Sequence, residues 1–402
     1  MLRIRPLTVV FAAVLTCVAA LAAPPAGAAP LACGAVITKD TTLHADLTDC
    51  PGDGLVVGAD GITLDLNGHS ITGTGGGGGA DIVYGDTENG VDNTAGHSDV
   101  TIQNGRIERF DVGVKLNEGD ANLLTRLAFG RNLAGVLPLE SHGTVIEHNR
   151  MESNSFGLYL YESAAGTIVD NELTGNGFGM YPVEASDNLI ERNSIVDSTI
   201  LGMQVTDESN RNQILNNVIG GSQSVGLLLS TSTDNVVEGN RLTRHPTIGL
   251  IIADTERTAV RRNTIAAGGP SAGAPPPFAG VWVTVENHDV ELRRNSVTAY
   301  PVGIRLDGPQ TGLVVARNEV FGNSGDGIFA GEGVAGLIDR NLAHHNGDDG
   351  IDVEDSGTYL VRNVAYSNGD YGIEAVPGAD GGGNVASGNG NPAQCLNVAC
   401  SG

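Results

Sequence analysis

The stretches SDNLIERN (residues 186–193) and STDNVVEGN (residues 232–240) both end on an asparagine that recurs along most of the chain. An apolar residue stands three positions before this anchor, as Ile190 and Val237 do. Successive anchors are 22 to 24 residues apart, except for one step of 32. Such a short unit cannot bury an apolar face alone, so the units must stack on one another. The anchors are Asn149, Asn171, Asn193, Asn217, Asn240, Asn263, Asn295, Asn318, Asn341 and Asn363, and extrapolation adds Asn67, Asn104, Arg126 (in the same slot) and Asn384.

Each repeat also has the features of short β-strands. A second polar slot follows five residues after the anchor, and a later glycine leads an alternating strand such as GLYLYE (157–162) or GIDVED (350–355). Alternation, Gly/Asn corners and the lack of a helical period indicate β structure throughout. Asparagine side chains stacked at inward corners can satisfy each other's amides as a ladder. The alternation predicts these inward residues: Leu158, Met180, Met203, Leu227, Leu250, Val281, Ile304, Ile328, Ile351 and Ile373.

The pattern S-x-x-N-x-[IV]-x-x-N in these stretches resembles the parallel β-helix repeat of the pectate-lyase-like superfamily, in the form shared by NosD-type proteins and sugar-hydrolase modules. The resemblance covers about residues 55–390. It implies an all-β, single-stranded right-handed parallel β-helix of about 13 coils with three short strands per coil. The fold carries lyases, hydrolases, epimerases, adhesins and tailspikes, so it implies no single activity. A NosD-like role in copper handling is disfavoured, because only three methionines remain after the first and the nine histidines do not repeat in register.

The two ends of the chain predict an exported protein. Arg3 and Arg5 precede an apolar run, and AGA at 26–28 offers small residues for cleavage, so residues 1–28 predict a signal peptide and a secreted, extracellular product. Residues 29–54 are expected to cap the first coil and residues 391–402 the last. Cysteines at the two extremities of an exported chain suggest disulfides. The expected pairs are Cys33–Cys50 and Cys395–Cys400.

The charge balance limits the partners. Removing the signal leaves 20 basic against 47 acidic residues, or 20 − 47 = −27. A chain this acidic repels nucleic acid and anionic membranes, so we expect neither nucleic-acid binding nor membrane insertion. We expect a monomer whose partner is a polysaccharide.

An outward stripe follows the corner glycines and is unusually rich in aromatic residues. Aromatic rings along a groove suit the apolar faces of sugars, and exposed apolar stripes usually have a partner. The alternative is that strands favour such residues on any face, or that a loop covers them. The candidate substrate-binding residues are Tyr159, Tyr161, Tyr181, Trp282 and Phe329.

Two insertions interrupt the repeat, at residues 73–97 and directly before the Trp282 strand. Long loops on a rigid scaffold are often binding or lid elements. The first carries Asp81, Asp86, Glu88 and Asp92, which could hold Ca²⁺ but fit no EF-hand spacing, and a solvated loop is the better interpretation. We expect no certain cofactor and leave the metal unassigned.

A second outward stripe stacks arginines on five successive coils. Like charges this close are unfavourable unless acids interleave or an anion binds. Glu291, Glu319 and Asp339 could interleave, and polyanion binding is the other interpretation. The stacked residues are Arg262, Arg294, Arg317, Arg340 and Arg362.

Candidate catalytic residues lie on the aromatic stripe. Lyases and epimerases of this fold need a basic residue, which Arg305 beside Asp307 could provide. Asp352 and Glu354 stand at i, i+2 on one face, roughly 7 Å apart, which suits an inverting hydrolase. In HHNGDDGIDVED (344–355), Asp348 and Asp349 are interpreted as turn-formers, and the histidines His344 and His345 have no counterpart in neighbouring coils.

Two functions of different classes remain open. The first is a secreted protein that binds, and cleaves or epimerises, a polysaccharide along the outward strands, as a lyase, hydrolase or uronate epimerase. The alternative is a non-catalytic glycan-binding, surface-binding or structural β-helix. A groove in which Arg305, Asp307, Asp352 and Glu354 converge favours the first; a stripe covered by loops favours the second.

Overall fold

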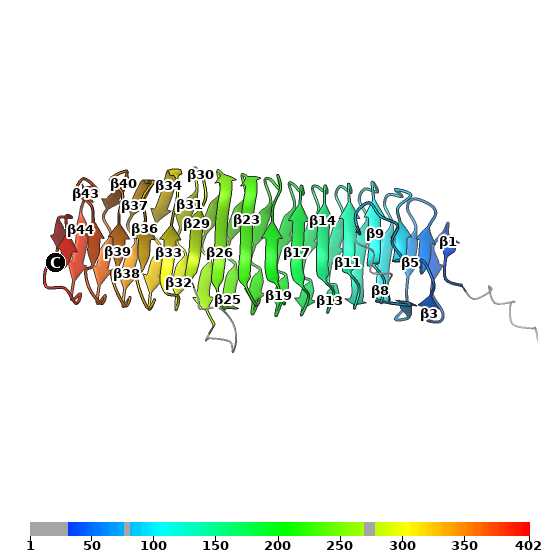
Figure 1. Cartoon of the computed structure of the whole chain (residues 1–402). Coiled ribbons are helices and arrows are strands. Elements are labelled where there is room, and N and C mark those ends of the chain that lie inside the picture. The colour runs from blue at the N-terminus through cyan, green and yellow to red at the C-terminus, as the bar shows by residue number, and fades with distance from the viewer. Residues whose placement is uncertain (1–30, 76–80, 269–277) are drawn as a thin grey trace, which may run out of the picture. The chain divides into compact units, whose positions relative to one another are not determined.

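The computed structural model describes residues 31–75, 81–268 and 278–402, and residues 31–402 form one compact unit. The described chain is all β and builds a single 46-stranded parallel sheet wound into a solenoid of about 15 turns. Figure 1 shows the strands following one another in chain order along the solenoid. The right-handed parallel β-helix is therefore confirmed. It has more turns than the expected 13, because strands also form at both ends of the predicted repeat region.

The strands fall into three columns, in which each strand pairs with its equivalents one coil before and one coil after. The first column contains β1 (Ala35–Ile37), β4 (Leu55–Val57), β7 (Asn89–Asn93), β9 (Val112–Asn117), β11 (Ala134–Leu139), β14 (Phe156–Tyr161), β17 (Phe178–Val183), β20 (Leu201–Val205), β23 (Val225–Thr233), β26 (Ile248–Glu256), β29 (Ala279–Thr284), β33 (Val302–Leu306), β36 (Ile328–Ala330), β39 (Ile351–Val353), β42 (Ile373–Ala375) and β45 (Cys395–Leu396). The second contains β2 (Thr41–Thr42), β5 (Thr63–Asp65), β8 (Thr101–Glu108), β10 (Leu123–Gly130), β12 (Val145–Glu147), β15 (Thr167–Val169), β18 (Leu189–Glu191), β21 (Gln213–Leu215), β24 (Val236–Glu238), β27 (Ala259–Arg261), β30 (Asn287–His288), β31 (Glu291–Arg293), β34 (Gln310–Ala316), β37 (Val334–Asp339), β40 (Thr358–Val361) and β43 (Asp380–Gly382). The third contains β3 (Leu47–Cys50), β6 (Ser70–Gly73), the ends of β8 and β10, β13 (Arg150–Glu152), β16 (Glu172–Thr174), β19 (Ser194–Val196), β22 (Val218–Gly220), β25 (Arg241–His245), β28 (Thr264–Ala267), β32 (Ser296–Thr298), β35 (Glu319–Phe321), β38 (Leu342–His344), β41 (Val364–Tyr366), β44 (Asn384–Ser387) and β46 (Cys400–Ser401).

The core runs through the middle of the solenoid as stacked rows of aliphatic side chains. All ten residues that we expected to point inward, from Leu158 to Ile373, are fully buried. Alternation therefore orients the first column, since every second residue of a strand faces the same side. The residues between them point outward.

The asparagine ladder is also confirmed. The backbone N–H and the side-chain amide of Asn149 both donate to Oδ1 of Asn171, at 3.0 and 3.1 Å, and its amide donates to the Leu124 carbonyl at 2.9 Å. The same arrangement continues coil by coil to Asn384. Shorter ladders occupy another corner, one of them from Asn323 to Asn389. Each ladder satisfies buried corner groups that water cannot reach.

The register before Asn149 differs from the prediction. The slot that we assigned to Arg126 is filled by Leu127, whose N–H donates to Asn149 Oδ1 at 2.9 Å. Arg126 instead stacks with Asn104 one position earlier, and its Nε donates to Asn104 Oδ1 at 2.8 Å. The ladder therefore ends at Asn149, because an apolar side chain in that slot cannot continue the amide bonds.

The structure also bears on the predicted disulfides, the first insertion and the predicted ends of the chain. The two predicted disulfides, Cys33–Cys50 and Cys395–Cys400, are present. The stretch 73–97 is not one loop, because β7 pairs with β4 and β9 inside it. Strands β1 to β3 pair with β4 to β6 in the expected N-terminal cap, so the boundary between cap and coils stays a prediction. The predicted signal peptide and most of the insertion before Trp282 lie outside the described residues. No helix in the described ranges is long and apolar enough to cross a membrane.

Candidate functional site

The outward residues of the first column form a continuous band, which we call the outer stripe. They stack in register from coil to coil, so that Trp282 pairs with Arg305, Arg305 with Phe329, and Phe329 with Asp352. Most of them are half-buried rather than fully exposed. The outer stripe comprises Tyr159, Tyr181, Gln204, Leu228, Ile251, Trp282, Arg305, Phe329, Asp352 and Glu374.

At one end of the outer stripe the aromatic side chains stack face to face. The rings of Tyr159 and Tyr181 lie 5.1 Å apart, and those of Phe156 and Phe178 lie 5.3 Å apart. Tyr161 meets Tyr159 edge-on at 6.0 Å. The phenylalanines were missed in the sequence, although both stand directly before a corner glycine, in SFGL and GFGM. The predicted binding residues of this end are thus brought together with two additional rings.

Residues 81–88 cover the beginning of this aromatic end. Ile82 packs with buried Leu137, and the Tyr84 ring meets Tyr161 edge-on at 5.8 Å. Lys115 lies beneath the same segment, donates to Thr87 Oγ1 at 3.3 Å, and is almost fully buried. The alternative interpretation, that a loop covers the stripe, therefore holds for its first coils, while Tyr181 and later residues stay half-exposed.

In the middle of the outer stripe, Trp282, Arg305 and Asp307 form one connected group. The indole N–H donates to Asp307 Oδ2 at 2.8 Å, and Arg305 Nε donates to the same oxygen at 2.6 Å. The Arg305 guanidinium carbon lies 5.1 Å from the Phe278 ring centre and 4.8 Å from that of Phe329. Two of the predicted catalytic residues are thus an ion pair held among aromatic rings, which favours binding and positioning over proton abstraction.

At the other end, the outer stripe runs into a depression lined by acids. Its lining includes Asp352 and Glu354, both predicted as catalytic, with Glu374 on the next coil. Arg305 and Asp307 do not line it, so the four predicted catalytic residues fall into two neighbouring groups. The further acids of the depression are Asp326, Asp348, Asp349 and Asp370.

Burial perturbs these acids strongly. Removal from water, reinforced by the charges of Asp326 and Glu374, raises the pKa of Asp352 to about 7. Burial also raises the pKa of Asp349 to about 8, although the N–H of Tyr371 donates to its carboxylate. Burial raises the pKa of Asp326 as well. At neutral pH the site therefore holds protonated carboxyl groups, which can donate a proton.

The prediction that Asp349 only forms a turn is incomplete. Its Oδ1 does accept the Tyr371 N–H at 2.7 Å, and Asp326 Oδ1 accepts the Asp349 N–H at 3.2 Å. The same carboxyls nevertheless line the depression, and Asp349 is only 6% exposed. The equivalent positions in GDGI and DDGI were visible in the sequence, but their burial was not. Asp326 and Asp349 therefore belong to the site.

The neighbouring histidines are outside this cluster. His344 lies on β38 of the third column and is stacked between Phe321 and Tyr366, with ring centres 5.2 and 4.9 Å away. Its Nδ1 lies 2.9 Å from Nδ1 of His345. The histidines therefore do not take part in the acid site.

One group of carboxylates lies close enough together to share a cation. Oxygens of Asp326, Asp348 and Asp349 lie within 4.8 Å of one another, the sole such group of three or more ligands in the described ranges. Carboxylate oxygen suits hard cations such as Ca²⁺. The thioethers of Met151, Met180 and Met203, which a copper ion would prefer, are all buried in the core.

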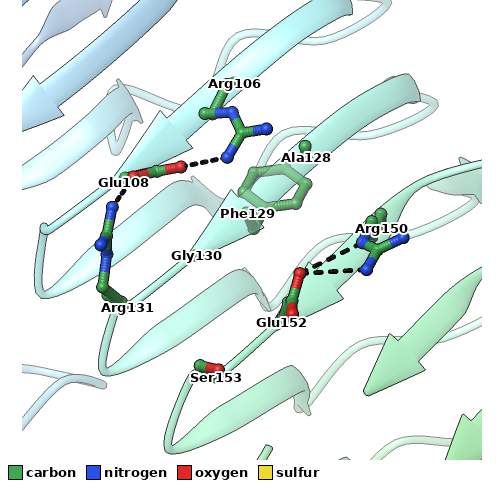
Figure 2. A pocket seen from close by; sticks show the side chains of 9 residues that line it. All are labelled: Arg106, Glu108, Ala128, Phe129, Gly130, Arg131, Arg150, Glu152 and Ser153. Atoms are coloured by element: carbon green, nitrogen blue, oxygen red, sulfur yellow. Dashed lines mark hydrogen bonds and ion pairs between the residues drawn. The ribbon is translucent and has the colours of Figure 1, made fainter. Parts of the chain in front are cut away.

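A second depression lies on the third column and is compensated by its own charges. Figure 2 shows Arg106 and Arg131 pointing at Glu108 from two sides, and Arg150 pairing with Glu152. Burial alone would raise the pKa of Glu108, but hydrogen bonds from both arginines outweigh it and lower that pKa. Because its charged side chains pair with one another, we interpret this depression as a structural feature and not as a binding site.

Comparison with known proteins gives two family matches. The family described as "Periplasmic copper-binding protein (NosD)" matches residues 50–225 and 91–270, which together span more than half of the chain. The family described as "Right handed beta helix region" matches residues 247–390. No curated protein matches the sequence.

Solved structures share the fold at low identity. A double mutant of the tailspike protein of E. coli bacteriophage HK620, in complex with a pentasaccharide, is 12% identical, with 91% of this chain and 73% of that chain covered and a TM-score of 0.54. Another form of this tailspike, also with a pentasaccharide, is 12% identical over 91% of this chain and 71% of that chain, with a TM-score of 0.51. The periplasmic alginate epimerase AlgG is 14% identical over 76% and 77% of the two chains, with a TM-score of 0.48. At such identities the likeness concerns the fold alone.

Proposed function

The chain belongs to the NosD family of β-helix proteins, and from that premise we propose that it is an exported protein that binds a linear polysaccharide along the outer stripe and cleaves it at the acidic end. The observation that carries the proposal is the continuity of the stripe. Stacked aromatic rings, the Trp282–Asp307–Arg305 group and acids with raised pKa values occupy one column of in-register strands. Flat rings bind sugar faces, and half-buried acids donate protons. The tailspike that shares the fold was solved with a bound pentasaccharide, which is in keeping with this function.

The copper named in the family's description is not proposed for this chain. The methionines are inside the core, and the four described cysteines are in disulfides. His344 and His345 offer two nitrogens, and no third ligand joins them among the described residues. A binding site for copper needs accessible soft or imidazole donors, and those are not gathered here.

In the proposed reaction, Asp352 is the general acid and Glu354 the general base. The two stand at i, i+2 on one face, roughly 7 Å apart by the rise of a strand, a separation that leaves room for a water molecule. Glu354 takes a proton from that water as it attacks the anomeric carbon. The glycosidic C–O bond breaks, and protonated Asp352 gives its proton to the leaving oxygen. The product is a free reducing end of inverted configuration.

The Trp282–Asp307–Arg305 group has a positioning role in this proposal. The indole ring can lie against a sugar face, while its N–H is anchored by Asp307. The guanidinium is held between two phenyl rings and can donate its remaining N–H groups to sugar hydroxyls or a carboxylate. Sugar units bound by this group, two or three units away from the cleaved bond, would then hold the polysaccharide in position at Asp352.

The test is a polysaccharide panel incubated with the purified protein, with reducing ends and unsaturated-uronate absorbance followed in parallel. We expect reducing ends without uronate absorbance, and loss of at least 10²-fold in rate for Asp352→Asn or Glu354→Gln. The matched control is Glu172→Gln, an exposed acid on β16 of the third column, which leaves the rate unchanged. Uronate absorbance instead of simple reducing ends would contradict hydrolysis and favour a lyase.

The non-catalytic alternative is distinguished by binding. A polysaccharide that binds, but is not altered by the wild-type protein, would leave a glycan-binding module, with Trp282→Ala weakening the complex. If no glycan in the panel is bound or altered, the carbohydrate function fails and a structural role remains.

We also propose that a calcium ion competes with protons for the carboxyl groups of the same site. The oxygens of Asp326, Asp348 and Asp349 are close enough to share a cation. A bound cation favours the ionised carboxylates and would lower the pKa of nearby Asp352. Calcium should therefore inhibit cleavage, and Tb³⁺ luminescence should report the site in wild type but not in Asp349→Asn. Calcium-dependent activation would contradict this arrangement.

A further inference from the structure

Three exposed arginines stack at a corner that does not line the acid site. Arg262, Arg294 and Arg317 precede successive ladder asparagines and share a left-handed backbone, with φ of 57°, 55° and 57°. Equivalent residues of neighbouring coils lie about 4.8 Å apart, so the three side chains leave the solenoid side by side. The whole chain carries a net charge of −25, which makes a local row of positive charge exceptional.

The adjoining strands deepen this corner into a depression. Arg261 of β27 pairs in register with Arg293 of β31, and the next position is Ala316 of β34. Because the Ala316 side chain is short and buried, the space above it stays open beside the longer arginines. The result is a depression of about 240 Å³, lined by Arg261, Arg262, Arg293, Arg294, Arg317 and Glu291.

The acids near the depression are already engaged by some of its arginines. Glu238 pairs with both Arg261 and Arg262, and Glu291 pairs with Arg293. The other two arginines of the lining, Arg294 and Arg317, form no ion pair with any described carboxylate within 4.0 Å.

The acids expected to interleave here act elsewhere. Asp339 pairs with its neighbour Arg340 and with Arg362 on the next coil, and Glu319 lies 3.4 Å from His344. Interleaving therefore explains the two ends of the arginine row but not its centre. The centre is left with uncompensated positive charge.

Another corner of the same solenoid shows how this chain balances its charges. There the stacked residues alternate in sign as Asp187, Arg211, Asp234, Arg257 and Asp289. Arg211 Nε donates to Asp187 at 2.8 Å, and Arg257 Nε donates to Asp234 at 2.7 Å. Alternation removes the repulsion that stacked like charges suffer. The arginine row therefore differs from this second corner, because its charges do not alternate in sign.

We propose that the depression between Arg293, Arg294 and Arg317 binds a tetrahedral dianionic oxyanion, either phosphate or sulfate. Guanidinium groups present paired N–H donors that match the oxygens of such anions, and two uncompensated groups match a double charge. A dianion also removes the repulsion within the row. The volume of about 240 Å³ is enough for one anionic group. The anion could be free or could be an ester on a saccharide, and both share this chemistry.

The experiment is calorimetric titration of the full chain with inorganic phosphate, inorganic sulfate, glucose 6-phosphate and glucose 6-sulfate, at constant ionic strength in chloride. The variant is Arg294→Gln/Arg317→Gln, and the matched control is Arg211→Gln/Arg257→Gln from the alternating corner. We expect saturable binding by wild type and by the control, and at least tenfold weaker binding by the variant. Tighter binding of the sugar esters would identify a glycan-borne anion, and equal binding a free ion.

Thermal unfolding gives a second readout that does not need the ligand. In chloride, Arg294→Gln/Arg317→Gln should melt at or above the wild-type temperature, because it removes uncompensated charge, whereas the control should melt lower. The absence of any saturable anion binding by wild type would overturn the proposal, as would equal binding by the variant. Trp282→Ala should bind the anion normally, so failure of this site is distinguishable from failure of the polysaccharide function.

Discussion

The indole nitrogen of Trp282 donates a hydrogen bond of 2.8 Å to Asp307, on the next coil of the solenoid. The same carboxylate oxygen accepts Nε of Arg305 at 2.6 Å. Trp282 was predicted to bind substrate, and Arg305 and Asp307 were predicted to be catalytic. The three side chains therefore form one hydrogen-bonded unit. This unit stands between the aromatic end and the acidic end of the outer stripe.

Replacing Trp282 should weaken polysaccharide binding through the loss of the ring and of its anchor. We expect Trp282→Ala to cost about 1–3 kcal/mol of binding free energy, and Trp282→Phe less, since a flat ring is kept. Titration calorimetry with the bound glycan measures both. Tyr359→Ala is the control, because Tyr359 is 52% exposed on β40 of the second column, away from the stripe. Equal losses for Trp282→Ala and Tyr359→Ala would argue against a specific stripe.

Stability should fall as the pH rises through the neutral range. Asp349 and Asp352 have pKa values of about 8 and about 7 in the folded protein, against an ordinary value of 3.8. Between pH ~4 and those values the folded state binds more protons than the unfolded state, so the free energy of unfolding decreases with pH. Together the two carboxyl groups should account for several kcal/mol of that decrease by pH 8.

Thermal melts between pH 5 and 8.5 check this dependence. Asp349→Asn should flatten the profile and raise the melting temperature at pH 8, since an amide carries no charge to bury. Its effect at pH 5 should be small. A profile in Asp349→Asn that is as steep as in wild type would show that other groups cause it.

Breaking the asparagine ladder in its middle should be costly. Asn240 donates to the Ile214 carbonyl at 2.7 Å and to Asn263 Oδ1 at 3.1 Å, and its own Oδ1 accepts two bonds from Asn217. Asn240→Ala leaves these buried partners unsatisfied, at a cost of about 2–4 kcal/mol. Urea unfolding measures it, with Gln213→Ala on the exposed side of β21 as the control. A cost below about 1 kcal/mol would mean that water enters the corner.

The glycine before each inward residue of the first column should resist substitution. A Cβ at Gly226 would lie 2.5 Å from the Gly249 carbonyl oxygen and 2.6 Å from Nε2 of His245. His245 is fully buried, and its Nε2 donates to the Ile219 carbonyl oxygen at 3.0 Å, so the ring cannot easily move aside. Gly226→Ala should therefore destabilise the protein by about 1–3 kcal/mol.

The control for this change is Gly52→Ala, where an added Cβ meets nothing within 4 Å. We expect it to be within about 0.5 kcal/mol of wild type, as for an ordinary surface change. Chemical unfolding of both variants separates close packing of the coils from a general intolerance of alanine. Equal stability of Gly226→Ala and wild type would contradict the tight spacing.

The sequence by itself determined the parts of this protein that repeat. Repeats of 22 to 24 residues with inward apolar residues can bury those residues only by stacking as coils. The stacking in turn places the asparagines from Asn149 to Asn384 in one ladder. The cysteine pairs were readable for the same local reason, since each pair lies within one end of the chain. Register failed where the pattern itself weakened, at the predicted anchors Asn104 and Arg126, because Gly105 and Leu127 fill the ladder slot on those coils.

Only the tertiary structure decided which outward residues act together. Asp326 lies one coil before Asp349 and Asp352, and the pKa values of all three rise because stacking of the coils removes them from water, a property that no single repeat contains. Likewise, Arg305 forms an ion pair with Asp307, and Phe278 from an adjacent coil lies against its guanidinium. A linear pattern specifies the face on which a side chain lies, but burial and charge partners depend on what the coils above and below bring to it.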